Sequence, residues 1–167
     1  MSPDQKTIYV TGPEKGSQVP TVWKVNTDGS NPEKFVDNCG SVTDIDAGGQ
    51  YLLGVVWFGG KSGIYEVPTS NRKCIPLLPG VETIHATIAR DGKSFLYAVA
   101  SRGEVTIYRQ PWSDGKTIGA PQVAVKVPFT FPIFYLSGNA YDFSPDLSTI
   151  VYARPGGHAD LYLLSQK

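Results

Sequence analysis

Residues 144–152 read SPDLSTIVY, a polar turn followed by a run of apolar and β-branched residues. Three other stretches keep the same order: SPDQKTIYV at residues 2–10, AGGQYLL at residues 47–53 and RDGKSFLY at residues 90–97. The equivalent turn positions stand 44, 43 and 55 residues apart and are Gln5, Gly49, Gly92 and Leu147. Internal repetition at a fixed period is the strongest signal in this chain, and it decides the fold.

A second marker follows each turn and keeps step with it. It is an aromatic residue inside a short apolar run: VWKV at residues 22–25, IYEV at residues 64–67, IYRQ at residues 107–110 and LYLL at residues 161–164. A period in the low forties built from short β-runs is typical of β-propeller blades, each a four-stranded antiparallel sheet. The strands expected in the second copy are 42–46, 50–57, 63–67 and 73–78, and those in the third are 83–89, 94–100, 105–110 and 122–127.

The sequence therefore predicts an all-β fold, a β-propeller of about four blades within residues 1–167 taken as one propeller segment. The approximate blades are 1–40, 41–80, 81–127 and 139–167, with an insertion at 128–138. The first copy lacks its first strand and the fourth ends after its third, at strands 140–143, 149–153 and 161–164. We expect this segment to be part of a larger ring, or of a ring completed by an oligomer, because unpaired strand edges favour pairing with another chain.

Composition excludes several classes of protein. The 167 residues carry 15 Lys+Arg and 15 Asp+Glu, so a net charge of +0 gives no support to nucleic-acid binding. Gly 18 and Pro 13, with 18% charged and 11% aromatic residues, favour short strands and tight turns over a helical bundle. The longest nearly apolar run, residues 51–58, is far shorter than the roughly 20 residues of a membrane helix. The first six residues contain no secretory signal.

The sequence points to no catalytic machinery and to no cofactor or metal site. It contains no GxSxG, HExxH, P-loop or GxGxxG motif. His85 lies in an alternating run, which predicts a strand residue facing a neighbour rather than a catalyst. His158 precedes Asp160 in a loop, where a His-Asp pair has no evident nucleophile. Cys39 and Cys74 have no metal-ligand spacing and are interpreted as small apolar residues or incidental thiols.

Candidate binding residues come from the inner strands and from one face of loops. Asp44 and Asp142 occupy matching positions and are predicted to line the central channel; Asp44 with Asp46 could alternatively hold Ca²⁺ or Mg²⁺. Loops on a rigid scaffold collect binding residues. The candidates in these loops and in the insertion are Phe58, Arg102, Phe131, Phe134, Tyr135, Arg154 and His158. The aromatic insertion would cover the channel mouth, pack on the next blade or contact another protein.

The repeats resemble those of TolB-type, WD-like β-propellers. The resemblance rests on Ser-Pro-Asp at Ser2 and Ser144, on RDGK at residues 90–93 and on WKVNTDGSN at residues 23–31. The ending, YAR at residues 152–154 and DLYLL at residues 160–164, looks most like the C-terminal propeller of bacterial serine/threonine kinases or transcription regulators. The resemblance implies a bacterial module of a signalling or envelope protein. It favours a periplasmic or extracytoplasmic location and leaves a cytoplasmic one open.

We therefore expect a non-catalytic, protein-interaction or ligand-sensing propeller, not an enzyme. Its partner would be a protein or a small ligand, with no nucleic acid, no membrane insertion and possible homo-oligomers through open blade edges. One alternative is a gating propeller of a prolyl-oligopeptidase-like hydrolase whose catalytic domain lies outside this sequence. Another is a metal-dependent enzymatic propeller that uses Asp44 and Asp142.

Overall fold

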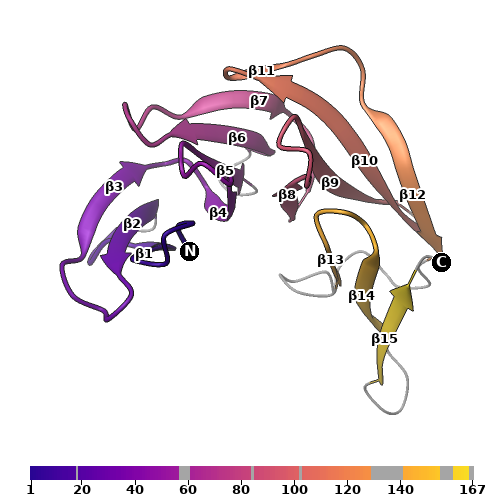
Figure 1. Cartoon of the computed structure of the whole chain (residues 1–167), viewed down its shortest axis with the longest axis horizontal. Coiled ribbons are helices and arrows are strands. Elements are labelled where there is room, and N and C mark those ends of the chain that lie inside the picture. The colour runs from indigo at the N-terminus through magenta and orange to yellow at the C-terminus, as the bar shows by residue number, and fades with distance from the viewer. Residues whose placement is uncertain are drawn as a thin grey trace.

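The computed structural model describes residues 1–17, 19–56, 61–83, 85–101, 103–128, 141–154 and 160–165, with backbone alone for residue 141 and for residues beyond 151 (Figure 1). Fifteen strands and no helix are assigned within these ranges. The described part accordingly contains no helix long and apolar enough to cross a membrane.

The strands form four antiparallel sheets in chain order, which we call blades 1 to 4. Blade 1 contains β1 (Thr7–Pro13), β2 (Pro20–Asn26) and β3 (Glu33–Asp37); blade 2 contains β4 (Ser41–Ile45), β5 (Tyr51–Val56), β6 (Gly63–Pro68) and β7 (Ile75–Pro79). Blade 3 contains β8 (Ala86–Ile88), β9 (Ser94–Ser101), β10 (Glu104–Ser113), β11 (Lys116–Thr117) and β12 (Gln122–Pro128); blade 4 contains β13 (Tyr141–Phe143), β14 (Thr149–Arg154) and β15 (Asp160–Ser165).

The four blades stand side by side along an open arc rather than a closed ring (Figure 1). The first strands of blades 2, 3 and 4 lie on the inner side of this arc, and the last strands lie on the outer side. Blade 1 has three strands, with β1 at its edge. The predicted all-β fold built from propeller-like sheets is confirmed.

Blade 3 differs from the expected strands in two places. Its first strand is short and pairs with β9 from Ala86 to Ile88; just before it, the Thr83 hydroxyl donates to the backbone carbonyl of His85 (2.9 Å). Its third strand is long, because β10 continues past Gln110 and turns back as the β10–β11 hairpin. Part of the extra length of the third repeat is therefore this hairpin, and not the 128–138 segment alone.

The turns that precede β1, β5, β9 and β14 confirm the repeat register. The four positions aligned from sequence all have left-handed backbone: Gln5 (φ 59°), Gly49 (φ 68°), Gly92 (φ 64°) and Leu147 (φ 58°). Where Ser-Pro-Asp precedes this position, the serine secures the turn: the Ser144 hydroxyl donates to Asp146 (2.7 Å) and accepts from the amide of Thr149 (3.0 Å). Glycine adopts this conformation without strain, whereas Gln5 and Leu147 need such support.

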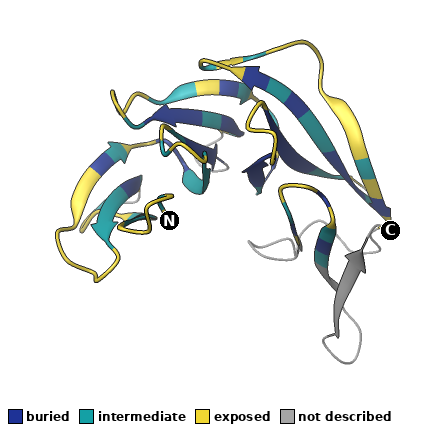
Figure 2. Cartoon of the chain, viewed as in Figure 1, coloured by how far each residue is buried: buried dark blue, intermediate teal, exposed yellow. Residues whose placement is uncertain are grey.

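The hydrophobic core lies between the blades, since neighbouring sheets pack face to face. Successive residues of one strand serve different interfaces: Leu52 packs toward blade 1 and Leu53 toward blade 3. Because side chains alternate across a strand, a blade buried on both faces needs a nearly continuous apolar second strand. Figure 2 shows this dark core along β5 and β9, with exposed residues gathered at the turns and outer strands.

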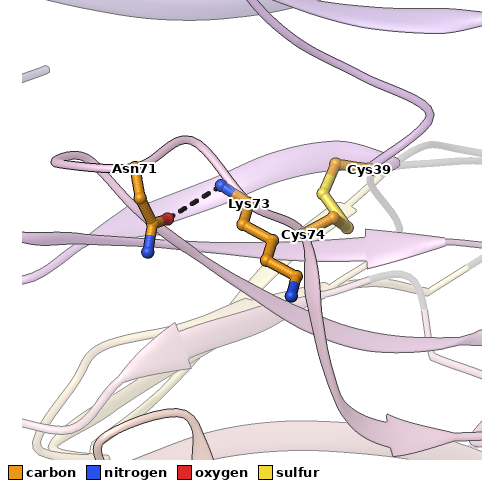
Figure 3. The surroundings of a disulfide bond; sticks show 4 residues. All are labelled: Cys39, Asn71, Lys73 and Cys74. Atoms are coloured by element: carbon orange, nitrogen blue, oxygen red, sulfur yellow. Dashed lines mark hydrogen bonds between the residues drawn. A yellow bond between two sulfur atoms is a disulfide. The ribbon is translucent and has the colours of Figure 1, made fainter.

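The cysteines were interpreted incorrectly from sequence. Cys39, between β3 and β4, and Cys74, just before β7, form a disulfide with a Cα–Cα distance of 5.8 Å (Figure 3). Beside it, the side-chain oxygen of Asn71 accepts the amide hydrogen of Lys73 (2.9 Å), which shapes the loop that carries Cys74. This bond could not be predicted from local spacing, because the residues are 35 positions apart and the packing of blade 1 on blade 2 brings them together.

Candidate functional site

The inner strands carry a polar row that runs across blades 2, 3 and 4. Three residues occupy equivalent positions one residue before the end of each first strand: Asp44 on β4, Thr87 on β8 and Asp142 on β13. His85 lies just before β8. We call Asp44, His85, Thr87 and Asp142 the inner-strand row.

Asp44 connects two blades through hydrogen bonds. Its Oδ2 accepts from the hydroxyl of Thr87 (2.5 Å) and from the backbone amide of Ile88 (2.8 Å), both in blade 3. Its Oδ1 accepts from the amide of Ile45 (2.8 Å). Charge-assisted hydrogen bonds of this kind are among the stronger ones in proteins. The Oδ2 atom of Asp44 therefore connects β4 of blade 2 to β8 of blade 3, while Oδ1 binds within β4.

Asp142 and His85 form the second contact of the row, between blades 3 and 4. The His85 Nε2 atom lies 3.1 Å from Asp142 Oδ1, although the angles do not meet hydrogen-bond geometry. The His85 ring packs edge-on against Phe143 at 4.8 Å between centroids. Burial lowers the pKa of His85, and the charges of Asp142 and Asp44 oppose this shift. The Asp142 side chain is 74% exposed, so its carboxylate is open to solvent on β13, an inner strand of the arc (Figure 1).

The row has little of the geometry that metal binding requires. Asp46 takes part in the turn after β4, where its Oδ1 accepts from the amides of Gln50 and Tyr51 (both 2.6 Å). Asp44 and Asp46 therefore serve different structures instead of converging on one cation. Among the described residues, no group of three or more His, Cys, Asp or Glu side chains could hold a metal ion.

Most of the predicted binding residues cannot be compared with the structure. Phe58, Arg102, Phe131, Phe134, Tyr135 and His158 lie outside the described residues. Arg154 ends β14, and only its backbone is described. These assignments stay predictions.

Sequence reasoning missed a second feature, the buried carboxyl group of Glu66 on β6. Glu66 is 1% exposed, whereas the equivalent Lys24 and Arg109 of neighbouring copies are partly exposed. The difference is the β10–β11 hairpin of blade 3, whose Gly115 lies close to the Glu66 carboxylate. A charged residue at a repeat position usually faces solvent. In the sequence, the burial of Glu66 is therefore indicated by the Asp114-Gly115 turn of the covering hairpin, and not by Glu66 itself.

Comparison with known proteins relates the chain to propellers by structure alone. No protein-family model matches the sequence, and no curated protein matches it. Among solved structures, TolB from Acinetobacter baumannii has a TM-score of 0.60 at 18% identity, covering 98% of this chain and 50% of that one. The β-propeller domain of the Trilobed protease from Pyrococcus furiosus has a TM-score of 0.53 at 11% identity, covering 96% and 51%. This chain has a TolB-like β-propeller fold.

The same propeller architecture occurs in proteins with different activities. An oligogalacturonate lyase in complex with manganese has a TM-score of 0.54 at 18% identity, with 87% of this chain and 41% of that chain covered. The chain thus spans about half or less of the length of these propeller proteins. At such identities the likeness establishes the fold, and function has to be argued from the residues of this propeller.

Proposed function

We propose that this propeller is a non-catalytic binding module that recognises a protein segment or small ligand along the inner side of its arc. The observation that carries the proposal is the use of the inner-strand acids. Asp44 accepts two hydrogen bonds from blade 3 through Oδ2, so this carboxylate supports the scaffold, while the exposed Asp142 lies on the inner strand β13 beside His85 (Figure 1).

The ligand chemistry follows from this exposed acid. A small cleft of about 140 Å³ opens between blades 1 and 2 next to Asp44, lined by Met1, Tyr9, Val42, Thr43, Asp44, Ile45 and Leu52. A polypeptide segment crossing the inner side would meet this cleft and Asp142 in turn. Lys or Arg side chains are the natural partners of an exposed carboxylate. A basic peptide segment is therefore the occupant that the row favours.

The test is direct binding of fluorescent peptides at low ionic strength. We expect Lys- and Arg-containing decapeptides to bind more tightly than acidic ones, and Asp142→Asn to weaken this binding several-fold. Asp28→Asn is the matched control, because Asp28 accepts the amide of Ser30 in an outer turn of blade 1. Equal affinity of basic and acidic peptides, or an Asp142→Asn variant that binds like the natural protein, would overturn the proposal.

Two other functions are distinguished by separate measurements. A rise in melting temperature with Mn²⁺ that Asp44→Asn and Asp142→Asn both abolish would favour a metal-dependent enzymatic propeller. A GxSxG-containing domain in the flanking sequence would favour a gating propeller, as the likeness to peptidase propellers suggests. A kinase or DNA-binding domain there would favour a sensing module of a signalling protein.

The disulfide indicates the cellular compartment in which the module functions. Disulfides persist in oxidising compartments and are rare in the reducing cytosol. Cys39–Cys74 thus supports the periplasmic or extracytoplasmic location that the TolB resemblance implies. Finding both thiols free in protein isolated from its native host under alkylating conditions would contradict this location.

The edge strand β1 supports a further part of the proposal, association through open blade edges. In blade 1 the strand order is β1-β2-β3, so β1 has one side without a partner strand among the described residues. We expect light scattering after size exclusion to show oligomers at micromolar concentration. A strict monomer over that range would contradict it.

A further inference from the structure

A second cleft, separate from the inner-strand row, lies where blade 2 meets the β10–β11 hairpin of blade 3. Its volume is about 450 Å³, which falls within the range of small-molecule sites. Its lining is mostly polar and comprises Gln50, Tyr51, Glu66, Pro68, Thr69, Ser70, Asn71, Ile75 and Asp114. The cleft is thus bounded by the turn before β5, the β6–β7 loop and the tip of the hairpin.

The unusual group in this cleft is the Glu66 carboxylate. Glu66 points to the same side of β6 as Ile64, toward blade 3, because side chains alternate along a strand. It is 1% exposed, and neither carboxylate oxygen has a hydrogen-bond partner among the described residues. An unpaired buried carboxylate is strongly unfavourable, so it takes up a proton or binds a cation.

The surroundings of Glu66 disfavour its charge and supply no counter-ion within the cleft. Burial raises the pKa of its carboxyl group, and the charges of Asp114 and Asp46 raise it further. The Trp112 indole and the Gly115 amide face the carboxylate and lower the pKa, but neither reaches hydrogen-bond geometry. No lining residue of the cleft carries a positive charge. The cleft therefore holds two carboxylates, several neutral hydrogen-bonding groups and no internal counter-ion.

We propose that this cleft binds a small organic cation, a ligand with a primary ammonium or guanidinium group whose charge lies against Glu66. Thr69, Ser70 and Asn71 supply hydroxyl and amide groups for its polar substituents, and Asp114 adds a second carboxylate at the rim. A divalent metal ion fits less well, because Ca²⁺ prefers six to eight oxygen ligands and the described residues hold no cluster of three acids.

The β10–β11 hairpin controls access to the Glu66 carboxylate. Gly115 has φ +75° and lies so close that a Cβ built there would be 3.3 Å from Ile75 Cδ1 and 3.6 Å from Glu66 Oε1. The Asp114-Gly115 turn thus covers the carboxylate at the edge of the cleft. A bound ammonium group reaches Glu66 by a small outward shift of this turn, while β10 stays anchored by the Gln110 side-chain amide, which donates to the carbonyls of Ile118 (3.3 Å) and Gly119 (3.2 Å).

The experiment is calorimetric titration of the protein with agmatine, which carries both cationic groups, at pH values from 5 to 8. We expect saturable binding that tightens as the pH rises, because the cation binds the ionised carboxylate and the raised pKa of Glu66 opposes ionisation at the lower pH values. Glu66→Gln should weaken binding at least tenfold and remove this pH dependence. Asp114→Asn should weaken it a few-fold, and Glu82→Gln, at an exposed position, should leave it unchanged.

Each contrary result overturns the proposal. Agmatine that fails to bind, or that binds Glu66→Gln as tightly as the natural protein, excludes a cation at Glu66. If Ca²⁺ or Mn²⁺ binds in place of agmatine with the same Glu66 dependence, the site is a metal site. The proposal stands apart from the peptide-binding function, because Asp142→Asn should leave agmatine affinity unchanged while it weakens peptide binding.

Discussion

Two neighbouring interfaces share one architecture but differ in what stabilises them. The first lies between blades 1 and 2, and the second lies between blades 2 and 3. The first has a small buried cluster: Val22, Phe35, Cys39, Leu52 and Val67. The second has a larger, aromatic cluster: Leu53, Val55, Ile64, Leu77, Ala86, Ile88, Phe95, Tyr97 and Trp112. The first is crosslinked by a disulfide, and among the described residues only the second contains a buried unpaired carboxylate.

The difference shows how apolar area and polar groups balance in an open propeller. Burial of apolar surface stabilises by roughly 25 cal/mol per Å², so a small interface gains less and benefits more from a covalent link. A large aromatic interface has enough favourable free energy to tolerate the cost of an unpaired acid such as Glu66. On this view blade 1 depends on its disulfide, whereas the interface between blades 2 and 3 keeps Glu66 for a reason other than stability.

Removal of the disulfide should have the largest effect. The Cys39→Ala/Cys74→Ala double variant should lose about 3–4 kcal/mol of unfolding free energy, the value expected from loop-closure entropy for residues 35 positions apart. Hydrogen exchange should show β1–β3 losing protection first. Reductant should destabilise the natural protein alone and leave the double variant unaffected. Uniform loss of protection across all blades would contradict a disulfide that acts at the first interface.

Loss of the Asp44 contacts should come next. Asp44→Ala should destabilise the protein by about 1–3 kcal/mol, because the buried amide of Ile88 and the Thr87 hydroxyl lose their acceptor. Thr87→Val should cost less, since it removes a single hydrogen bond. Denaturant unfolding of both variants and the double variant forms a double-mutant cycle. Additive effects would show that Asp44 does not stabilise the second interface through Thr87.

The repeat made the scaffold predictable, whereas the features formed between repeats could not be predicted. The left-handed turns at Gln5 and Gly92 follow from local sequence that recurs in each copy, so their alignment gave the register. The disulfide and the cleft at Glu66 depend instead on how one blade packs on the next, which no local pattern encodes. Asp44 lies between these cases: its place on the first strand of blade 2 was predictable, but its partners in blade 3 were not.

Replacement of the buried Glu66 tests the interface between blades 2 and 3, and it should change the free energy of unfolding by less than the preceding variants do. Glu66→Gln should stabilise the protein at neutral pH by about 1 kcal/mol, since it removes the charge without changing the shape. The raised pKa means that the folded state binds the proton more tightly than the unfolded state. Stability of the natural protein should therefore fall as pH rises from 4.5 through the folded-state pKa, and thermal melts of Glu66→Gln should lack this component.

The control for this comparison is the same substitution where no burial occurs. Glu82→Gln, at an exposed position, should melt like the natural protein at every pH. A Glu66→Gln variant that is less stable than the natural protein at neutral pH would show that the ionised carboxylate is paired, contrary to the arrangement of this interface.

The smallest effect is expected at the outer side of the first interface, where Arg72 reaches from blade 2 to blade 1. Its guanidinium lies 5.0 Å from the centre of the Phe35 ring and 2.6 Å from Glu33. Both partners of the ion pair are partly exposed, so Arg72→Ala should cost about 0.5–1 kcal/mol. Arg90→Ala, whose side chain is 82% exposed and 3.5 Å from Asp146, should cost nothing measurable by denaturant unfolding. If Arg72 helps to hold blade 1, its replacement in the disulfide-free variant should further lower the protection of β1–β3. Equal protection would show that Arg72 does not contribute to holding that blade.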